Sequence, residues 1–166
     1  MKNRWYKDMV FYHIWPRSFK DGNHDGIGDL YGVIEKLDYI QDLGCDGIWL
    51  SPIYPSPGKD CGYDVMDYMD IDKIYGGMEV FDQLVKEVHK RHMKLIMDLV
   101  VNHTSTAHEW FEKSRHKIEP YTDYYIWKKG KNHRPPNNWQ SNFEGSAWQY
   151  DSLRKEYYLH LFAIEQ

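Results

Sequence analysis

The strongest constraint on the fold is a short apolar run that ends in polar side chains. The run from Leu95 to Val101 is too short for a helix and rich in β-branched residues at its end. This pattern is typical of a strand buried on both faces of a sheet. Only Asp98 interrupts the run, and a carboxylate inside a buried strand is costly unless a partner pairs with it. Asn102 and His103 follow, at the strand tip where parallel α/β folds place their chemistry.

Two shorter apolar runs precede this one, and residues with a helical period separate all three. We expect strands over residues 10–14 and 48–50. A helix with Asp29 as its N-cap and Gly44 as its stop is predicted between them from Leu30, Val33, Ile34, Leu37, Ile40 and Leu43. A second helix before the third strand would bury Val80, Phe81, Leu84, Val85 and Val88. Strands and helices that alternate at this spacing predict parallel pairing with right-handed crossovers.

The pattern of the sequence changes after His103. Residues 108–114 predict a short helix, whereas residues 119–145 are rich in Tyr, Asn, Pro and Lys without a clear period. We interpret this stretch as an insertion that emerges from the tip of the third strand.

Composition argues against several classes of protein. The net charge of −4 argues against a nucleic-acid partner, which would favour a basic face. Cys45 and Cys61 do not make a disulfide framework, and no stretch approaches the length of a membrane span, so we expect a cytoplasmic protein without a membrane partner. The aromatic content of 16% is high. Such rings form cores first, but they also suit stacking on the flat apolar faces of ligands such as sugars.

The loop over residues 21–29 alternates oxygen donors with glycines, as in the first half of a calcium-binding loop. The glutamate expected at the twelfth position of such a loop is absent, because Gly32 stands there. A site for a hard cation, calcium or magnesium, is the better interpretation; a solvated acidic turn that caps the next helix is the alternative. A bound ion would stiffen the loop. Its donors would be Asp21, Asn23, Asp25, Ile27 and Asp29.

A second polar segment, Asp60-Cys61-Gly62-Tyr63-Asp64, lies in the loop after the second strand. Alone, its Asp-x-Gly-Tyr pattern is a common turn. Because it follows a strand next to the one that ends at His103, we expect a carboxylate, a phenol and an imidazole to surround one pocket. Such a set suits a ligand that carries hydroxyl groups.

Several motifs agree in order and spacing with one enzyme family. They are Ile14-Trp-Pro-Arg-Ser-Phe19, the loop over 21–29, Gly62-Tyr-Asp64 and Asp98-Leu-Val-Val-Asn-His103. From Trp5 to Gln166 the chain resembles the N-terminal third of an α-amylase superfamily glycoside hydrolase, with the oligo-1,6-glucosidase and α-glucosidase branch most similar. The resemblance implies an α/β fold, an incomplete (β/α)8 TIM barrel. Residues 1–103 would form its first three β/α units, and residues 104–166 most of an inserted domain B.

The resemblance also implies roles for single residues. Asp60, Tyr63 and His103 would hold the non-reducing terminal glucose, with Tyr63 stacked under the sugar ring. Phe143 and Phe162 would line the pocket from the inserted domain. Asp98 matches the buried carboxylate that supports a catalytic arginine, with Asn102 beside the site as a further supporting residue. The loop over 21–29 matches the calcium or magnesium site of the family, with Ile27 giving its carbonyl oxygen.

Members of this family are retaining glycosidases with an Asp nucleophile and a Glu general acid, roughly 5 Å apart. The resemblance places both carboxylates beyond Gln166, the first letter of a Gln-Pro-Asp-Leu-Asn motif, so we expect this chain alone to be inactive. The parent would be a monomer that releases glucose from short α-glucosides. Sucrose isomerase, trehalose-phosphate hydrolase and dextran glucosidase share these motifs. A non-catalytic relative, such as a transporter heavy-subunit ectodomain, and a calcium-binding module are alternatives outside catalysis.

Overall fold

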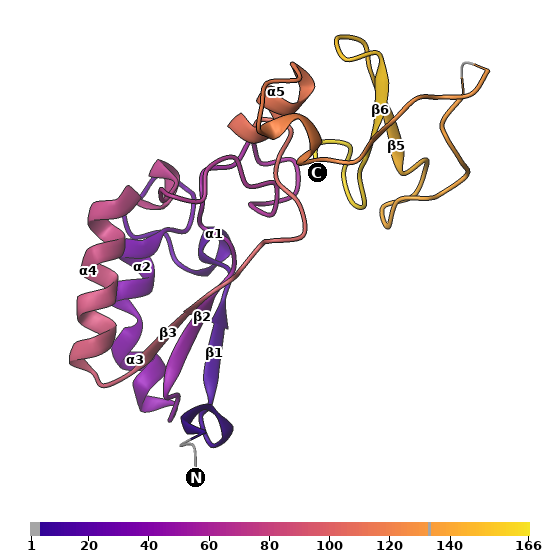
Figure 1. Cartoon of the computed structure of the whole chain (residues 1–166). Helices are drawn as coiled ribbons and strands as arrows, with labels where there is room; N and C mark the ends of the chain where they lie inside the picture. The colour runs from indigo at the N-terminus through magenta and orange to yellow at the C-terminus, as the bar shows by residue number, and fades with distance from the viewer. Residues whose placement is uncertain (1–3, 133) are drawn as a thin grey trace. The chain divides into compact units, whose positions relative to one another are not determined.

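The computed structural model describes residues 4–132 and 134–166, and the chain divides into two compact units. The first unit consists of Met1–Pro55 and Tyr68–Leu99, and the second of Ser56–Asp67 and Val100–Gln166. Figure 1 shows the elements of both units along the chain. No helix among the described residues is long and apolar enough to cross a membrane.

The first unit is a parallel sheet with helices packed on it. The strands β1 (Phe11–Ile14), β2 (Gly47–Leu50) and β3 (Lys94–Met97) pair in the order β1-β2-β3. Figure 1 shows α2 (Leu30–Glu35), α3 (Leu37–Asp42) and α4 (Gly77–Lys90) on one side of this sheet. The short elements η1 (Trp5–Lys7), α1 (Pro16–Phe19) and η2 (Lys73–Tyr75) complete the unit. The predicted alternation of strands and helices with parallel pairing is confirmed.

The core of the first unit lies between this sheet and its helices. Ile48 and Leu50 of β2 are fully buried, whereas Trp49 between them is partly exposed, as expected when successive strand residues point to opposite faces. The helices contribute most of the other buried residues, which include Leu30, Val33, Leu37, Ile40, Val80, Leu84 and Val88.

The prediction of a buried strand that runs from Leu95 to Val101 is wrong after Met97. The Asp98 N–H still donates to the Leu50 carbonyl at 3.1 Å, but β3 has ended. Ser51-Pro52 follows β2, and Pro52 has no N–H with which to continue the pairing. Leu99, 73% exposed, therefore lies outside the sheet, and the strand residues themselves are only partly buried.

The single helix predicted over residues 30–43 is two helices. Lys36 interrupts it with φ −102° and ψ 2°, and its N–H bonds the Val33 carbonyl three residues back, in a tighter turn than an α-helix makes. The predicted N-cap is confirmed, because the Asp29 side chain accepts from the Gly32 N–H. Gly44, with φ 84°, follows the end of α3 as predicted. Leu43 is exposed and does not belong to the buried face.

The second unit is a small antiparallel sheet with one helix. Strands β4 (Trp127–Lys128), β5 (Trp148–Asp151) and β6 (Glu156–Leu159) pair in the order β4-β6-β5, and sequence analysis predicted none of them. The short helix predicted over 108–114 is confirmed as α5 (Glu109–Arg115), followed by η3 (Tyr121–Asp123). The Phe111 ring packs on Trp127 and Tyr158, with centroids 5.5 and 5.1 Å away, and forms the centre of this unit.

Candidate functional site

Three segments of the second unit bring polar side chains together around Gln166. The Gln166 side-chain amide donates to Asp60 Oδ2 at 2.9 Å, and its nitrogen lies 2.9 Å from His103 Nε2. Gln166 is 6% exposed, so the amide is a buried bridge between the carboxylate and the imidazole. Two of the three side chains expected to hold one ligand, Asp60 and His103, are thereby joined, although sequence analysis gave Gln166 no role.

The imidazole of His103 has polar neighbours at both ring nitrogens. The Ala163 N–H donates to Gln166 Oε1 at 2.9 Å, which leaves the amide nitrogen to face Asp60 and His103. His103 Nε2 lies 2.9 Å from this nitrogen and 3.2 Å from the Tyr63 backbone carbonyl oxygen. Asn102 Oδ1 lies 3.2 Å from the other ring nitrogen, Nδ1. These contacts fix the orientation of the ring next to Asp60.

A buried carboxylate organises the turn that carries Asp60 and Tyr63. Asp64 is fully buried and accepts from the Ser56 hydroxyl at 2.7 Å and from the backbone N–H groups of Lys59 and Asp60 at 2.8 and 3.0 Å. A buried carboxylate needs such donors to offset the loss of hydration. The Tyr63 N–H donates to the Asp60 carbonyl at 2.9 Å and closes the turn.

Aromatic rings border the polar cluster. The Phe162 ring lies 5.1 Å from the His103 ring, and Phe143 lies 5.7 Å from Phe162. Ser141 holds the two phenylalanines together, since its hydroxyl donates to the Phe162 carbonyl at 2.6 Å and accepts from the Phe143 N–H at 3.1 Å. The rings of Phe143 and Tyr63 remain substantially exposed. Hydroxyl-binding groups beside exposed rings suit a ligand with a polar edge and a flat apolar face.

Asp98 belongs to the first unit and follows the last residue of β3. The structure places it as a partly buried residue and not as the buried carboxylate expected from sequence, because the strand ends before it. The Tyr54 hydroxyl donates to the Asp98 backbone carbonyl at 3.1 Å. Burial, and then the negative charge of Asp98, raise the pKa of Tyr54.

The loop over residues 21–29 is held by its own backbone N–H groups. Asp21 accepts from the N–H groups of Gly26 at 2.8 Å and His24 at 2.6 Å, and the bond from Gly26 is the main cause that lowers the pKa of Asp21. Asn23 Nδ2 donates to Asp25 Oδ2 at 3.0 Å. These oxygen donors are chemically those that calcium and magnesium prefer. Within residues 4–132 and 134–166, no group of three or more His, Cys, Asp or Glu side chains is placed so that it could hold a metal ion.

Asp29 has a separate structural role in this loop. Its buried carboxylate accepts from the N–H groups of Gly22, Asn23 and Gly32, and so caps α2. A side chain at Gly32 is excluded, because its Cβ would lie 2.0 Å from the Lys20 carbonyl oxygen. The close approach of α2 to Lys20 therefore explains why no glutamate occupies this position.

Comparison with known proteins identifies the family of the chain. The family described as "Alpha amylase, catalytic domain" matches residues 13–166. The chain belongs to this family. Asp60, Tyr63 and His103 all lie within the matched residues.

Individual members of the family match over 98–100% of the chain. Oligo-1,6-glucosidase of Bacillus cereus is 58% identical, with 100% of this chain and 30% of the relative aligned. Trehalose-6-phosphate hydrolase of Bacillus subtilis is 54% identical over 98% of this chain and 29% of its own length. The crystal structure of the isomaltulose synthase of Protaminobacter rubrum superposes with a TM-score of 0.96 at 54% identity, covering 100% of this chain and 30% of that one. The chain thus spans about 30% of the length of these relatives and has the α/β fold of alpha-amylase-family TIM-barrel enzymes.

Sequence analysis does not predict the roles of two residues of the cluster. The bridging role of Gln166 depends on a contact over 106 positions. Asp64 is visible in the sequence only as part of the Gly-Tyr-Asp motif. The sequence does contain a signal for Asp64, since the side chain of an acidic residue just after a tight turn often accepts hydrogen bonds from the backbone N–H groups of that turn.

Proposed function

We propose that a complete protein containing this chain is a retaining α-glucosidase of the oligo-1,6-glucosidase type. It hydrolyses non-reducing terminal α-glucosidic bonds of short oligosaccharides in carbohydrate catabolism. The observation that carries the proposal is the bridge from Gln166 to both Asp60 and His103, beside the rings of Phe162 and Phe143. The 58% identity to an oligo-1,6-glucosidase over the same residues supports it.

In this proposal the chain supplies residues that bind the terminal glucose. The Asp60 carboxylate accepts hydrogen bonds from sugar hydroxyls, while contacts with Asn102, Tyr63 and Gln166 orient His103. Tyr63 presents its ring to an apolar face of the sugar, and Phe162 and Phe143 close the side of the pocket. Such groups raise the rate only where they hold the transition state more tightly than the substrate.

Bond cleavage needs a nucleophilic carboxylate and a carboxylic acid, which we place outside residues 1–166. The nucleophile attacks the anomeric carbon while the acid protonates the leaving oxygen, and a covalent glycosyl intermediate forms. Water then hydrolyses this intermediate, so the configuration of the anomeric carbon is retained. We also propose that the parallel sheet provides three β/α units of a (β/α)8 barrel, and that residues 104–166 form most of domain B. The order β1-β2-β3 and the separate antiparallel sheet support this division.

We further propose a structural calcium or magnesium ion at the loop over residues 21–29. The side-chain oxygens of Asp21, Asn23 and Asp25 and the Ile27 carbonyl would hold it, with Asp29 completing the site. The oxygen-only donor set supports a hard cation. The ion would neutralise the acidic loop and stiffen it. We place the whole protein in the cytoplasm as a monomer, with an oligosaccharide as its partner.

Two related activities are also supported by named relatives. Trehalose-6-phosphate hydrolase and isomaltulose synthase are each 54% identical to this chain, so a phosphorylated disaccharide and sucrose are competing substrates. All three activities require that a terminal glucose is bound in the same way. They differ in the group on the other side of the cleaved bond.

Substrate turnover by the complete protein tests the proposal. We expect glucose release from isomaltose and from p-nitrophenyl α-glucoside, with the α-anomer detected first by NMR. Faster turnover of trehalose 6-phosphate or conversion of sucrose to an isomer would favour the related activities. No turnover of any of these substrates would refute the enzymatic proposal.

A further inference from the structure

One face of the antiparallel sheet carries a row of three side chains that the core of the unit does not use. Lys128, Tyr157 and Tyr150 lie directly opposite one another across β4, β6 and β5. Successive strand residues point to opposite faces, so Trp127 and Tyr158 lie on the other side, packed on Phe111. Tyr150 is 48% exposed, whereas Tyr158 is 8% exposed. The two faces therefore serve different purposes.

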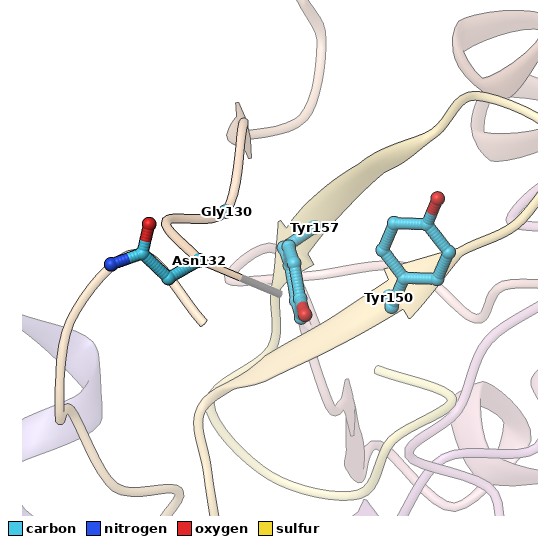
Figure 2. Close-up of a pocket in the computed structure, with 4 residues that line it drawn as sticks. All are labelled: Gly130, Asn132, Tyr150 and Tyr157. Atoms are coloured by element: carbon cyan, nitrogen blue, oxygen red, sulfur yellow. The ribbon is translucent and has the colours of Figure 1, made fainter. Parts of the chain in front are cut away.

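A hollow of about 630 Å³ opens beside the exposed Tyr150 and the partly buried Tyr157. It is lined by Gly130, Asn132, Tyr150 and Tyr157. The rings of the two tyrosines have centroids 5.1 Å apart and an interplanar angle of 60°. Figure 2 shows Tyr157 between Tyr150 and the loop that bears Asn132. The volume falls in the range of roughly 300–1,000 Å³ that is typical of small-molecule sites.

The backbone of the neighbouring loop maintains this hollow. A Cβ at Gly130 would lie 2.5 Å from Cε2 of Tyr157 and 2.5 Å from the Arg134 carbonyl oxygen, so only glycine lets the loop lie this close to the ring. Lys131 and Arg134 exchange backbone hydrogen bonds at 3.0 Å in both directions. Asn132 lies within this turn with φ 52°, a left-handed conformation that asparagine tolerates better than most residues.

We propose that this hollow is a second carbohydrate-binding site, which takes a neutral α-linked glucose oligosaccharide. None of the residues that line it belongs to the cluster around Gln166. The tyrosine rings present flat apolar faces to the C–H face of a pyranose, and the phenol hydroxyls and the Asn132 amide can bond sugar hydroxyls. The choice of an α-glucan, as opposed to another sugar, rests on the proposed function.

The charge of the hollow favours a neutral ligand. The surrounding segment is basic, with Lys128, Lys129, Lys131 and Arg134. Yet among the described residues, those that line the hollow are all uncharged. An anionic ligand would be held by charge-assisted bonds to lining cations. Stacking and neutral hydrogen bonds are what this hollow offers.

Affinity electrophoresis of the complete protein in native gels with soluble dextran or starch tests the inference. All variants carry His103→Ala, which weakens the binding of glucose at the Gln166 cluster. We expect the gel polysaccharide to retard the protein that carries His103→Ala alone, which is the parent of the other variants. Tyr150→Ala should weaken the apparent affinity about two- to tenfold, the range for loss of one aromatic contact. Asn132→Gly removes the amide but suits the left-handed backbone, and should also weaken binding.

Tyr39→Ala is the matched control, since Tyr39 is 52% exposed on α3 and should leave retardation unchanged. The inference is overturned if the parent is not retarded, or if Tyr150→Ala behaves like the control. Binding of dextran sulfate that salt abolishes, without binding of dextran, would also overturn it. Turnover of p-nitrophenyl α-glucoside is measured separately, in proteins with His103 intact. Absence of turnover would refute the proposed function. Tyr150→Ala should leave turnover unchanged.

Discussion

The arrangement of the cluster around Gln166 depends on the orientation of one amide group. The Ala163 N–H holds Gln166 Oε1, and this turns the amide nitrogen toward Asp60 and His103. A carboxylate at the same position would keep the bond from Ala163 but would have no proton to give. The substitution Gln166→Glu therefore isolates the donor role of Gln166 at nearly constant shape.

In a complete protein, Gln166→Glu should lower kcat/KM for p-nitrophenyl α-glucoside about 30- to 150-fold. Such a loss corresponds to about 2–3 kcal/mol, as expected when a buried charge-assisted bond is lost. The new carboxylate would lie beside Asp60, and like charges at this distance raise one pKa. We therefore expect the variant to recover part of its activity as the pH falls. Gln140→Glu, at an exposed position, is the control. Equal activity of both variants at all pH values would contradict the bridging role.

His108 is a second residue whose protonation has a structural consequence. Its Nδ1 accepts from the Trp110 N–H at 3.0 Å and caps α5, so the cap requires a neutral ring. Burial lowers the pKa of His108, although the charges of Asp67 and Glu109 oppose this. The unfolded segment therefore binds a proton first as the pH falls. The stability of the cap is present above the ordinary pKa of about 6.5 and is lost at lower pH.

Hydrogen exchange of the amides in α5 should report this loss. Between pH 7.5 and 5.5 we expect the opening free energy to fall by about 1 kcal/mol, the typical contribution of an N-cap. His108→Asn keeps a capping side chain and removes the titration, so its opening free energy should change little over the same range. His116→Asn, at the C-cap of α5, should retain the loss. A pH dependence that survives in His108→Asn would contradict the explanation.

At the scale of elements, the loop over residues 21–29 combines a helix cap with a candidate ion site; Asp29 serves both, whereas Asp25 serves only the ion site. Asp29 accepts from three backbone N–H groups, whereas Asp25 bonds only within the exposed part of the loop. Asp29→Ala should lower stability by about 2–4 kcal/mol even without ions, because buried N–H groups lose their acceptor.

Asp25→Asn should instead change only the response to ions. In the complete protein, calcium or magnesium at about 100 times its Kd should stabilise the native state by about 2.7 kcal/mol, and EDTA should remove this. Asp25→Asn should melt like the parent in EDTA but gain little from the ion. Asp42→Asn, exposed on α3, is the control. If no divalent ion raises the melting temperature of the parent, the proposed ion site is wrong.

The elements that sequence predicted best are those whose apolar pattern is local. The strand over 48–50 and the capped start of α2 at Asp29 follow from neighbouring residues. The end of β3 does not, since it depends on Pro52 of another segment. Sequence analysis missed β5 and β6 because each has only four residues and carries a charged residue at one end, Asp151 and Glu156. Asp151 is nevertheless buried, because it pairs with Arg115 at 2.7 Å and accepts from the Arg154 N–H at 2.7 Å.

The same distinction holds for the candidate site. Asp60, Tyr63 and His103 were predicted because strand tips and turn motifs identify them, and all three lie in the second unit. Gln166 was missed as a bridge because its partners are 106 and 63 positions away. Sequence thus pointed to polar groups that the structure places in one unit. It did not predict the residue that bridges Asp60 and His103.

At the scale of the whole molecule, the first unit presents a sheet with two open edges. In the order β1-β2-β3, both β1 and β3 have a side on which no described strand pairs. Val10, before β1, is 57% exposed and Leu99, after β3, is 73% exposed. Unpaired edges flanked by apolar side chains favour association between chains.

We therefore expect the 166-residue chain, produced alone, to aggregate and to release no p-nitrophenol from p-nitrophenyl α-glucoside. Aggregation should follow from the sheet edges, so Val10→Lys with Leu99→Lys should lower light scattering at equal concentration, because charges at an edge oppose pairing. Leu153→Lys changes an exposed leucine outside the strands of the second unit and should have little effect. Equal scattering by the edge and control variants would show that another surface drives association. Hydrolysis by the purified chain would contradict the placement of both catalytic carboxylates outside it, since residues 1–166 would then contain groups able to form and break the glycosyl intermediate.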